Sequence, residues 1–243
     1  APRLHIVHGK TAKKLLQMPW DYPVFHKPQP QNAAPTRGTV ASGPRVALPA
    51  ERAYAEIAGD DLRPLLILRE CDTCNGTDDA LLSKGNDNQR TFLMSRWFHC
   101  VKLPTHITEV DHPFHALFED KHPPHLFVSD YDGSNAIPLK GDQSRTELWE
   151  AMDSVLERSY KKSPQKAIRE LNKIISQYDR WDADEKRLLE QIDSEIERNG
   201  PKSSKLKKLN KSLTKVRLKK EAVAQQEKDV SELLLTVKPK PKE

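Results

Sequence analysis

Two cysteines, Cys71 and Cys74, are separated by two residues and follow an apolar run, in the stretch LLILRECDTCNGTDDALL. Thiol–disulfide exchange needs one thiolate to attack a disulfide and a second thiol to resolve the mixed disulfide, and a CxxC pair supplies both. The same spacing suits a structural disulfide or half of a metal site. The chain has three cysteines, and an odd number argues against a scaffold stapled by disulfides. The pair is therefore the first candidate site, with all three chemistries open.

The elements that must position this pair alternate between strand and helix patterns. A short apolar run, LLIL, precedes Cys71 and is bounded by Pro64, which is typical of a buried strand. Apolar spacing and turn residues predict the remaining elements around it. The predicted helices are residues 49–58, 77–82, 86–98, 111–120 and 144–160. The predicted strands are residues 98–103, 125–129 and 135–140, with more extended chain at 105–110.

The order strand, CxxC, helix, strand, helix, proline, hairpin and helix resembles the thioredoxin superfamily over about residues 50–160. Several positions carry the resemblance together. Cys71 and Cys74 follow a buried strand, Val110-Asp111 ends an extended segment and leads into a helix, and Pro124 opens the strand HLFV where that family has its cis-proline. Two strands and a helix between the CxxC and Asp111 are more similar to divergent branches of the superfamily than to thioredoxin itself.

The resemblance implies an α/β fold with a central sheet flanked by helices. It also implies roles at the pair: Cys71 would be the attacking thiol, Cys74 the resolving thiol, and Pro124 would lie against both. A cis Pro124 would, as in the family, disfavour metal binding there. These three residues are the predicted catalytic set, and no cofactor is expected.

The residues next to the pair depart from the family pattern. Glu70 replaces the usual aromatic residue, and Asp72 lies between the cysteines. Both carboxylates disfavour a nearby thiolate, whereas Arg69 could offset them. Asn75-Gly76 interrupts the helix whose N-terminus would lower the pKa of the first sulfur. The sequence therefore leaves open a slow or substrate-specific redox site, a lost activity, and an inert structural disulfide.

Histidines offer a competing, metal-binding interpretation. Six of the nine lie between residues 99 and 125: His99, His106, His112, His115, His122 and His125. His125 follows Pro124, beside the expected face of the pair, so Cys71, Cys74 and His125 could form part of a zinc or copper site. The other histidines show no standard ligand spacing and suit surface or capping roles. Cys100, in a predicted strand, suits a small core residue, or a redox partner if it approaches the pair.

Both ends of the chain differ from this central part. Residues 1–48 are rich in Pro and read as an extended arm or linker. Residues 161–236 predict an antiparallel α-helical coiled-coil hairpin, which begins at Ser163-Pro164 and turns at Asn199-Gly200-Pro201. Residues 237–243 are expected to be a disordered tail. The predicted thioredoxin-like domain is residues 49–160.

Charge is uneven along the hairpin. Residues 202–220 hold nine Lys or Arg and no acid, which could suit nucleic acid or another anionic surface. Because no aromatic side chain offers a base a stacking platform there, pairing with Glu185, Glu190, Asp193 and Glu195 is favoured. The expected partners are proteins, bound through the hairpin and the arm, and the oligomeric state stays open. No apolar run is long enough to predict a membrane span.

These observations support three hypotheses. The first is a thioredoxin-like thiol–disulfide exchange protein that its arm and hairpin tether to a partner or assembly. The second is a non-enzymatic adaptor that uses the same fold as a platform, and the third is a metal carrier that uses Cys71, Cys74 and nearby histidines. Met removal and signal-peptide cleavage both leave a small first residue such as Ala1, so the compartment stays open. The Pro-rich arm fits a secreted or periplasmic protein slightly better than a cytosolic one.

Overall fold

The computed structural model divides the chain into two compact units that interleave along the sequence. It describes residues 8–23, 47–71, 74, 76–83, 88–120 and 123–237. The helical unit comprises residues 1–17, 84–94 and 160–234, and the sheet unit comprises residues 18–83, 95–159 and 235–243. Most of the predicted arm, residues 24–46, and the tail from 238 onward lie outside the described residues.

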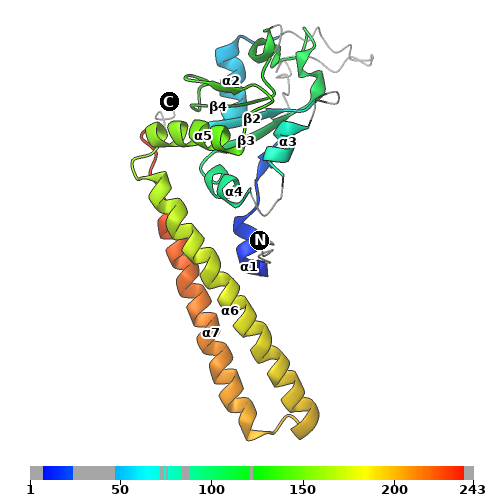
Figure 1. The fold of residues 1–243 in the computed structure, drawn as a ribbon, viewed down its shortest axis with the longest axis vertical. Coiled ribbons are helices and arrows are strands. Elements are labelled where there is room, and N and C mark those ends of the chain that lie inside the picture. Colours follow the sequence, from blue (N-terminus) through cyan, green and yellow to red (C-terminus); the bar gives the residue numbers. More distant parts are fainter. Residues whose placement is uncertain are drawn as a thin grey trace, which may run out of the picture. The chain divides into compact units, whose positions relative to one another are not determined.

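The sheet unit is built on five strands in the order β1-β3-β2-β4-β5 (Figure 1). The strands are β1 (Trp20–Asp21), β2 (Leu65–Arg69), β3 (His99–Leu103), β4 (Leu126–Ser129) and β5 (Ile137–Leu139). β1, β3 and β2 run parallel, whereas β4 is antiparallel to β2 and β5 is antiparallel to β4. The apolar run after Pro64 is therefore the central strand, as its residues predict.

Helices cover both faces of this sheet. The helical elements of the unit are α2 (Ala50–Ala58), α3 (Thr77–Leu81), α5 (Arg145–Ser159) and the 3₁₀ helices η2 (Thr105–Thr108) and η3 (His115–Phe118). Alternate strand residues such as Leu65, Ile67 and Val101 join one core cluster with α2, η2 and η3. α5 contacts β4 and contributes no residue to that cluster, so it covers the opposite face. The predicted mixed α/β sheet flanked by helices is confirmed.

Three segments differ from the sequence predictions. Residues 105–108 form a 3₁₀ helix rather than extended chain, and only four residues of the predicted helix 111–120 are helical. Two short elements, α1 (Lys10–Leu15) and β1, lie inside the predicted extended arm. Ala12 and Leu15 of α1 are buried, so the apolar residues of the arm give it local structure.

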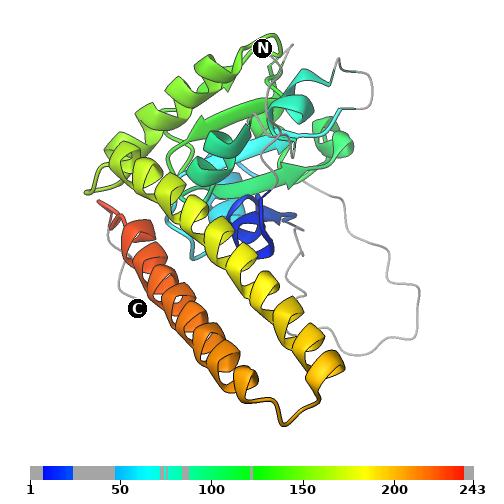
Figure 2. The ribbon, with the colours of Figure 1, turned by 60° about the horizontal axis from the view of Figure 1, so that its bottom comes forward.

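The helical unit contains a pair of long helices, α6 (Pro164–Asn199) and α7 (Ser204–Ser231), which lie side by side along their length (Figures 1 and 2). Ser163 caps α6 by accepting from the backbone N–H of Lys166, with Pro164 in the first turn, as predicted. A seam of apolar side chains joins the pair: Leu188, Leu213 and Val216, with Trp181, Ile192 and Leu209 beside them. The predicted C-terminal helical pair is confirmed, and its coiled-coil character stays a prediction.

Two carboxylates on α6 hold the short helix α1 in the same unit. Asp179 Oδ1 accepts from the backbone N–H of Gly9 at 2.6 Å, and Asp182 Oδ2 accepts from that of Thr11 at 2.7 Å. Lys220 of α7 pairs with Asp182 at 2.7 Å, so one carboxylate contacts both helices. α4 (Gln89–Ser95) joins α6 through a hydrogen bond from the Gln89 side-chain amide to Asn172. No described helix is long and apolar enough to span a membrane.

Candidate active site at the Cys71–Cys74 disulfide

The two predicted site cysteines are bonded to each other just beyond the end of β2. Their sulfur atoms are 2.01 Å apart and their Cα atoms 5.6 Å apart. Two backbone hydrogen bonds fix the chain before the pair: Arg69 donates to the carbonyl of His125 at 2.6 Å, and Glu70 donates to that of Leu103 at 2.8 Å. The sheet therefore positions the disulfide from both neighbours of β2.

The two cysteine residues differ in their exposure to solvent. Cys71 is half-buried next to the strand, whereas Cys74 is exposed. α3 begins at Thr77, three residues after Cys74. The helix therefore does not begin at the pair itself.

His125 lies against the exposed sulfur. Its Nε2 atom is 3.2 Å from Cys74 Sγ and its Nδ1 atom is 3.6 Å away. The Nη2 atom of Arg69 lies 3.2 Å from the same Nε2. Because a guanidinium donates and never accepts, Nε2 is the acceptor in this contact and the imidazole is neutral. The contacts therefore run from Arg69 at the end of β2, through His125, to the exposed residue Cys74.

Burial and charge both act on the imidazole. Burial lowers the pKa of His125, the charge of Arg69 lowers it further, and the carboxylate of Asp78 on α3 acts in the opposite direction. Burial also lowers the pKa of Arg69, but a guanidinium stays charged at neutral pH. The site thus combines a permanent positive charge with a neutral base beside Cys74.

Glu70, the residue before the pair, is bound by a lysine of the neighbouring strand. Its carboxylate forms an ion pair with Lys102 of β3 at 2.7 Å. The sequence predicted that this residue would disfavour a thiolate, and the ion pair reduces that effect. Asp72, the other carboxylate of concern, lies outside the described residues.

Pro124, the third predicted site residue, lies half-buried immediately before His125. The structure has no cis peptide bond among its described residues, which include Pro123 and Pro124, so the bond before Pro124 is trans. This differs from the cis-proline that the resemblance implies. The residue of this segment that contacts the pair is His125, through its imidazole.

The predicted metal ligands do come together. One donor atom each from Cys71, Cys74 and His125 lies within 4.8 Å of the other two. A metal ion binds cysteine as a thiolate, and the closed disulfide provides none. This set could therefore hold zinc or copper only after reduction, and metal binding stays a prediction.

Cys100, His99 and His112 have partners other than the residues of this site. Cys100 in β3 is buried, and burial raises the pKa of its thiol to about 12, so it is a core residue and unreactive as a nucleophile. His99 contacts Asp21 of β1 at 3.0 Å, and His112 accepts from the backbone N–H of Phe114 at 3.1 Å. Their positions suit the structural roles that the sequence left open.

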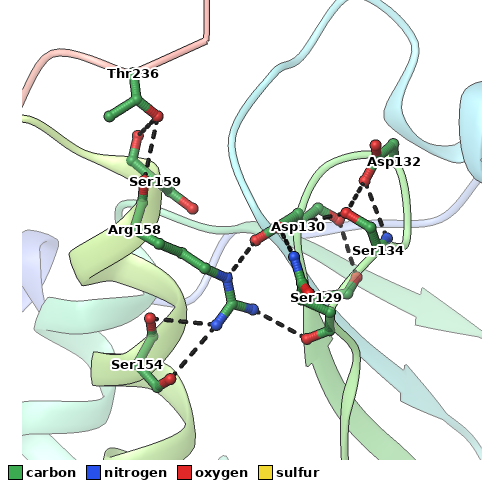
Figure 3. Close-up of polar contacts among 9 residues, drawn as sticks. Ser129, Asp130, Asp132, Ser134, Ser154, Arg158, Ser159 and Thr236 are labelled. Atoms are coloured by element: carbon green, nitrogen blue, oxygen red, sulfur yellow. Dashed lines mark hydrogen bonds and ion pairs between the residues drawn. The ribbon is translucent and has the colours of Figure 1, made fainter.

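A second polar cluster lies at the other end of β4 (Figure 3). Arg158 of α5 pairs with Asp130 at 2.8 Å and donates to the carbonyl of Asn135 at 3.0 Å. Thr236 donates to the carbonyl of Ser159 through its backbone N–H at 2.9 Å. A pocket of about 310 Å³ adjoins these residues. The charged groups of this cluster are paired with one another, which suits a structural role.

Acidic side chains of α6 neutralise part of the positive charge of residues 202–220. Glu185 accepts from Arg217 at 2.9 Å and from Lys220 at 2.7 Å, and Glu195 contacts Lys205 at 3.2 Å. Lys219 lies over the ring of Trp181, 4.4 Å from its centre. These contacts agree with the predicted pairing for Glu185 and Glu195, and they leave protein and nucleic-acid partners as predictions.

No family model, curated protein or solved structure matches this chain. The site therefore rests on its own geometry. Sequence reasoning found the cysteines but gave Arg69 only an offsetting role and treated His125 only as a metal ligand. The signal was present: Arg69 ends one strand and His125 immediately precedes another, so pairing of those strands brings them together.

Proposed function

We propose that this protein is a thioredoxin-like thiol–disulfide exchange protein that acts through Cys71 and Cys74. One observation carries the proposal: a closed CxxC disulfide lies at the end of a central strand, with the sulfur of Cys74, an exposed residue, 3.2 Å from a histidine. A structural disulfide needs no base and no cation beside it, whereas exchange benefits from both.

The order of elements supports the thioredoxin-like part of the proposal. β2 leads into the CxxC, α3, α4 and β3 follow, and Pro124 precedes the β4–β5 hairpin and α5. The trans bond before Pro124 and the 3₁₀ helices in place of a full helix at 111–120 depart from the family pattern, so the proposal is a divergent member rather than a close relative of thioredoxin. The arm and the helical pair would then dock the exchange domain on a protein partner.

The reaction conserves electrons between the two disulfides. A substrate disulfide accepts two electrons and becomes two thiols, while the Cys71 and Cys74 thiols lose two electrons and close their bond. A dithiol reductant then reopens the pair by the same chemistry. Run in the opposite direction, the closed pair oxidises a substrate dithiol.

The test is turnover of insulin disulfides by the full chain with dithiothreitol as reductant. We expect reduction faster than with dithiothreitol alone, and loss of this acceleration in both Cys71→Ser and Cys74→Ser. Cys100→Ala is the matched control, because it removes a thiol that the site does not use. No acceleration by the wild-type chain, or equal loss in Cys100→Ala, would contradict the proposal.

The adaptor and metal-carrier hypotheses predict different outcomes. An inert disulfide combined with partner capture through the helical pair would favour the adaptor. One equivalent of zinc or copper retained after purification under reducing conditions would favour the carrier, since the three donor atoms already lie within 4.8 Å.

A further inference from the structure

We infer that Cys74, rather than Cys71, is the sulfur that attacks and is attacked, with His125 as its catalytic base. This inference rests on the proposed exchange function and reverses the roles that the family resemblance implies. It identifies the sulfur that reacts directly with the substrate.

Accessibility is the first argument. Exchange requires the incoming sulfur to approach the attacked sulfur directly, so the rate depends on which sulfur can be reached. Cys74 is exposed, whereas Cys71 is half-buried behind the end of β2. An incoming thiolate therefore meets Cys74 first and displaces Cys71 as the leaving thiolate.

The second argument is the placement of the base. His125 Nε2 lies 3.2 Å from Cys74 Sγ, and the contact with Arg69 keeps this nitrogen an acceptor. In the reduced protein the Cys74 S–H can donate to the same Nε2, sharing its single lone pair with Arg69 or replacing that contact. The side chain is also well fixed, because His125 immediately precedes β4 and its carbonyl accepts from Arg69.

The third argument is the charge around this contact. Arg69 on β2 brings a positive charge to the imidazole edge that faces Cys74, and positive charge favours a thiolate over a thiol. Asp78 on α3 is the carboxylate that acts on His125, and Glu70 is paired with Lys102. Asp78 therefore opposes Arg69 at the imidazole, whereas the positive charge of Arg69 favours both a neutral His125 and a thiolate on Cys74.

The steps follow from this assignment. His125 takes the proton of the Cys74 thiol. The resulting thiolate attacks one sulfur of a substrate disulfide, a Cys74–substrate bond forms, and the second substrate sulfur leaves as a thiolate and takes up the proton from His125. The Cys71 thiolate then attacks Cys74 Sγ, the Cys71–Cys74 bond forms, and the first substrate sulfur leaves and is protonated. Two electrons pass from the protein to the substrate.

Single-cysteine variants of the full chain distinguish the two assignments. Reduced Cys71→Ser, which keeps Cys74, and reduced Cys74→Ser, which keeps Cys71, are each reacted with glutathione disulfide. The adduct is located by peptide mass spectrometry, which also reports on Cys100. We expect Cys71→Ser to form its adduct at least about tenfold faster, since one pKa unit changes the thiolate fraction tenfold.

The outcomes separate the inference from the proposed function. Equal rates, or a faster reaction of Cys74→Ser, would overturn the assignment of Cys74 while exchange itself stands. If neither variant reacts although both unfold like the wild type, the inference and the proposed function both fail.

A second comparison tests His125. In the Cys71→Ser background, His125→Asn is expected to slow adduct formation about tenfold at neutral pH and to move the pH–rate profile upward. In the Cys74→Ser background the same substitution should change the rate less than about twofold. His106→Asn, at an exposed histidine elsewhere in the unit, is the matched control. Equal effects in both backgrounds would show that His125 acts through the fold instead of through Cys74.

Discussion

An arginine lies beside each end of β4, Arg158 from α5 and Arg69 from β2, and the two have different surroundings. Arg158, at the Asp130 end, is held by a carboxylate and a backbone carbonyl. Arg69, at the His125 end, contacts a neutral imidazole and lies over the ring of Phe118, and no carboxylate of the described residues pairs with it. A charge paired with a carboxylate fixes a loop, whereas a positive charge beside a neutral imidazole and a sulfur can stabilise a thiolate. Substitution of Arg158 should therefore affect mainly stability, and substitution of Arg69 mainly the rate of thiol–disulfide exchange.

The largest effect on stability is expected from Gly133→Ala, in the loop after β4. Gly133 has a φ of 82°, and an added Cβ would lie 2.2 Å from ring atoms of Tyr54. The combined backbone strain and overlap should lower the free energy of unfolding of the sheet unit by about 2–4 kcal/mol. Denaturant unfolding measures this loss, with hydrogen exchange in β4 as the readout for the sheet unit.

Gly141→Ala is the matched control for that prediction. Gly141 has a similar φ of 91°, but an added Cβ would meet nothing within 4 Å. It should therefore show the backbone cost alone, about 1–2 kcal/mol. Equal losses in the two variants would show that the contact with Tyr54 does not contribute.

A smaller loss of stability is expected from Arg158→Ala. The substitution leaves the carboxylate of Asp130 and the carbonyl of Asn135 without their donor. Because both side chains of the ion pair are partly exposed, we expect a loss of about 1–2 kcal/mol. Thermal unfolding measures this loss, and the insulin-reduction rate should stay unchanged. A slower insulin reduction by a folded Arg158→Ala protein would show that Arg158 also affects exchange, against the proposed difference between the two arginines.

Arg69→Gln should produce the opposite pattern. It removes the positive charge beside His125 and Cys74, so adduct formation at Cys74 should slow by about three- to tenfold. The expected loss of stability is smaller than that of Arg158→Ala, since no ion pair of the described residues is broken. Parallel measurements of adduct rate and denaturant unfolding test both statements. A large loss of stability with an unchanged rate would assign Arg69 a structural role.

The smallest effect is the pH dependence of stability at His125. Because the folded protein lowers the pKa of this imidazole below its ordinary value near 6.5, the unfolded chain binds the proton more readily. The free energy of unfolding should therefore fall as the pH drops from neutral through this range. His125→Asn should flatten that part of the curve. An unchanged curve in the variant would mean that other groups cause the dependence.

The sequence predicted the parts of this site that depend on local pattern. The apolar run before Cys71, the hairpin after Pro124 and the Ser163-Pro164 start of α6 each follow from neighbouring residues. The contact between Arg69 and His125 depends instead on the register in which Leu68 faces Leu126, which no local pattern fixes. The ion pair between Glu70 and Lys102 likewise requires the pairing of β2 with β3.

Two further differences have simple physical causes. Thr105 to Thr108 buries only Ile107, and a single buried residue in four does not distinguish a 3₁₀ helix from extended chain. α1 has six residues and is held by Asp179 and Asp182 of α6, which lie about 170 residues away in the sequence. Such a helix is too short to be stable alone, so its own sequence predicts it weakly.

The most direct test of the exchange function is the redox equilibrium of the native full chain. The protein is equilibrated in glutathione buffers of graded ratio, quenched with acid, alkylated and analysed by peptide mass spectrometry. We expect one two-electron transition confined to Cys71 and Cys74, with Cys100 a buried thiol throughout and an unchanged circular dichroism spectrum. If the bond opens only under conditions that also unfold the sheet unit, the disulfide is structural and the proposed exchange function is contradicted.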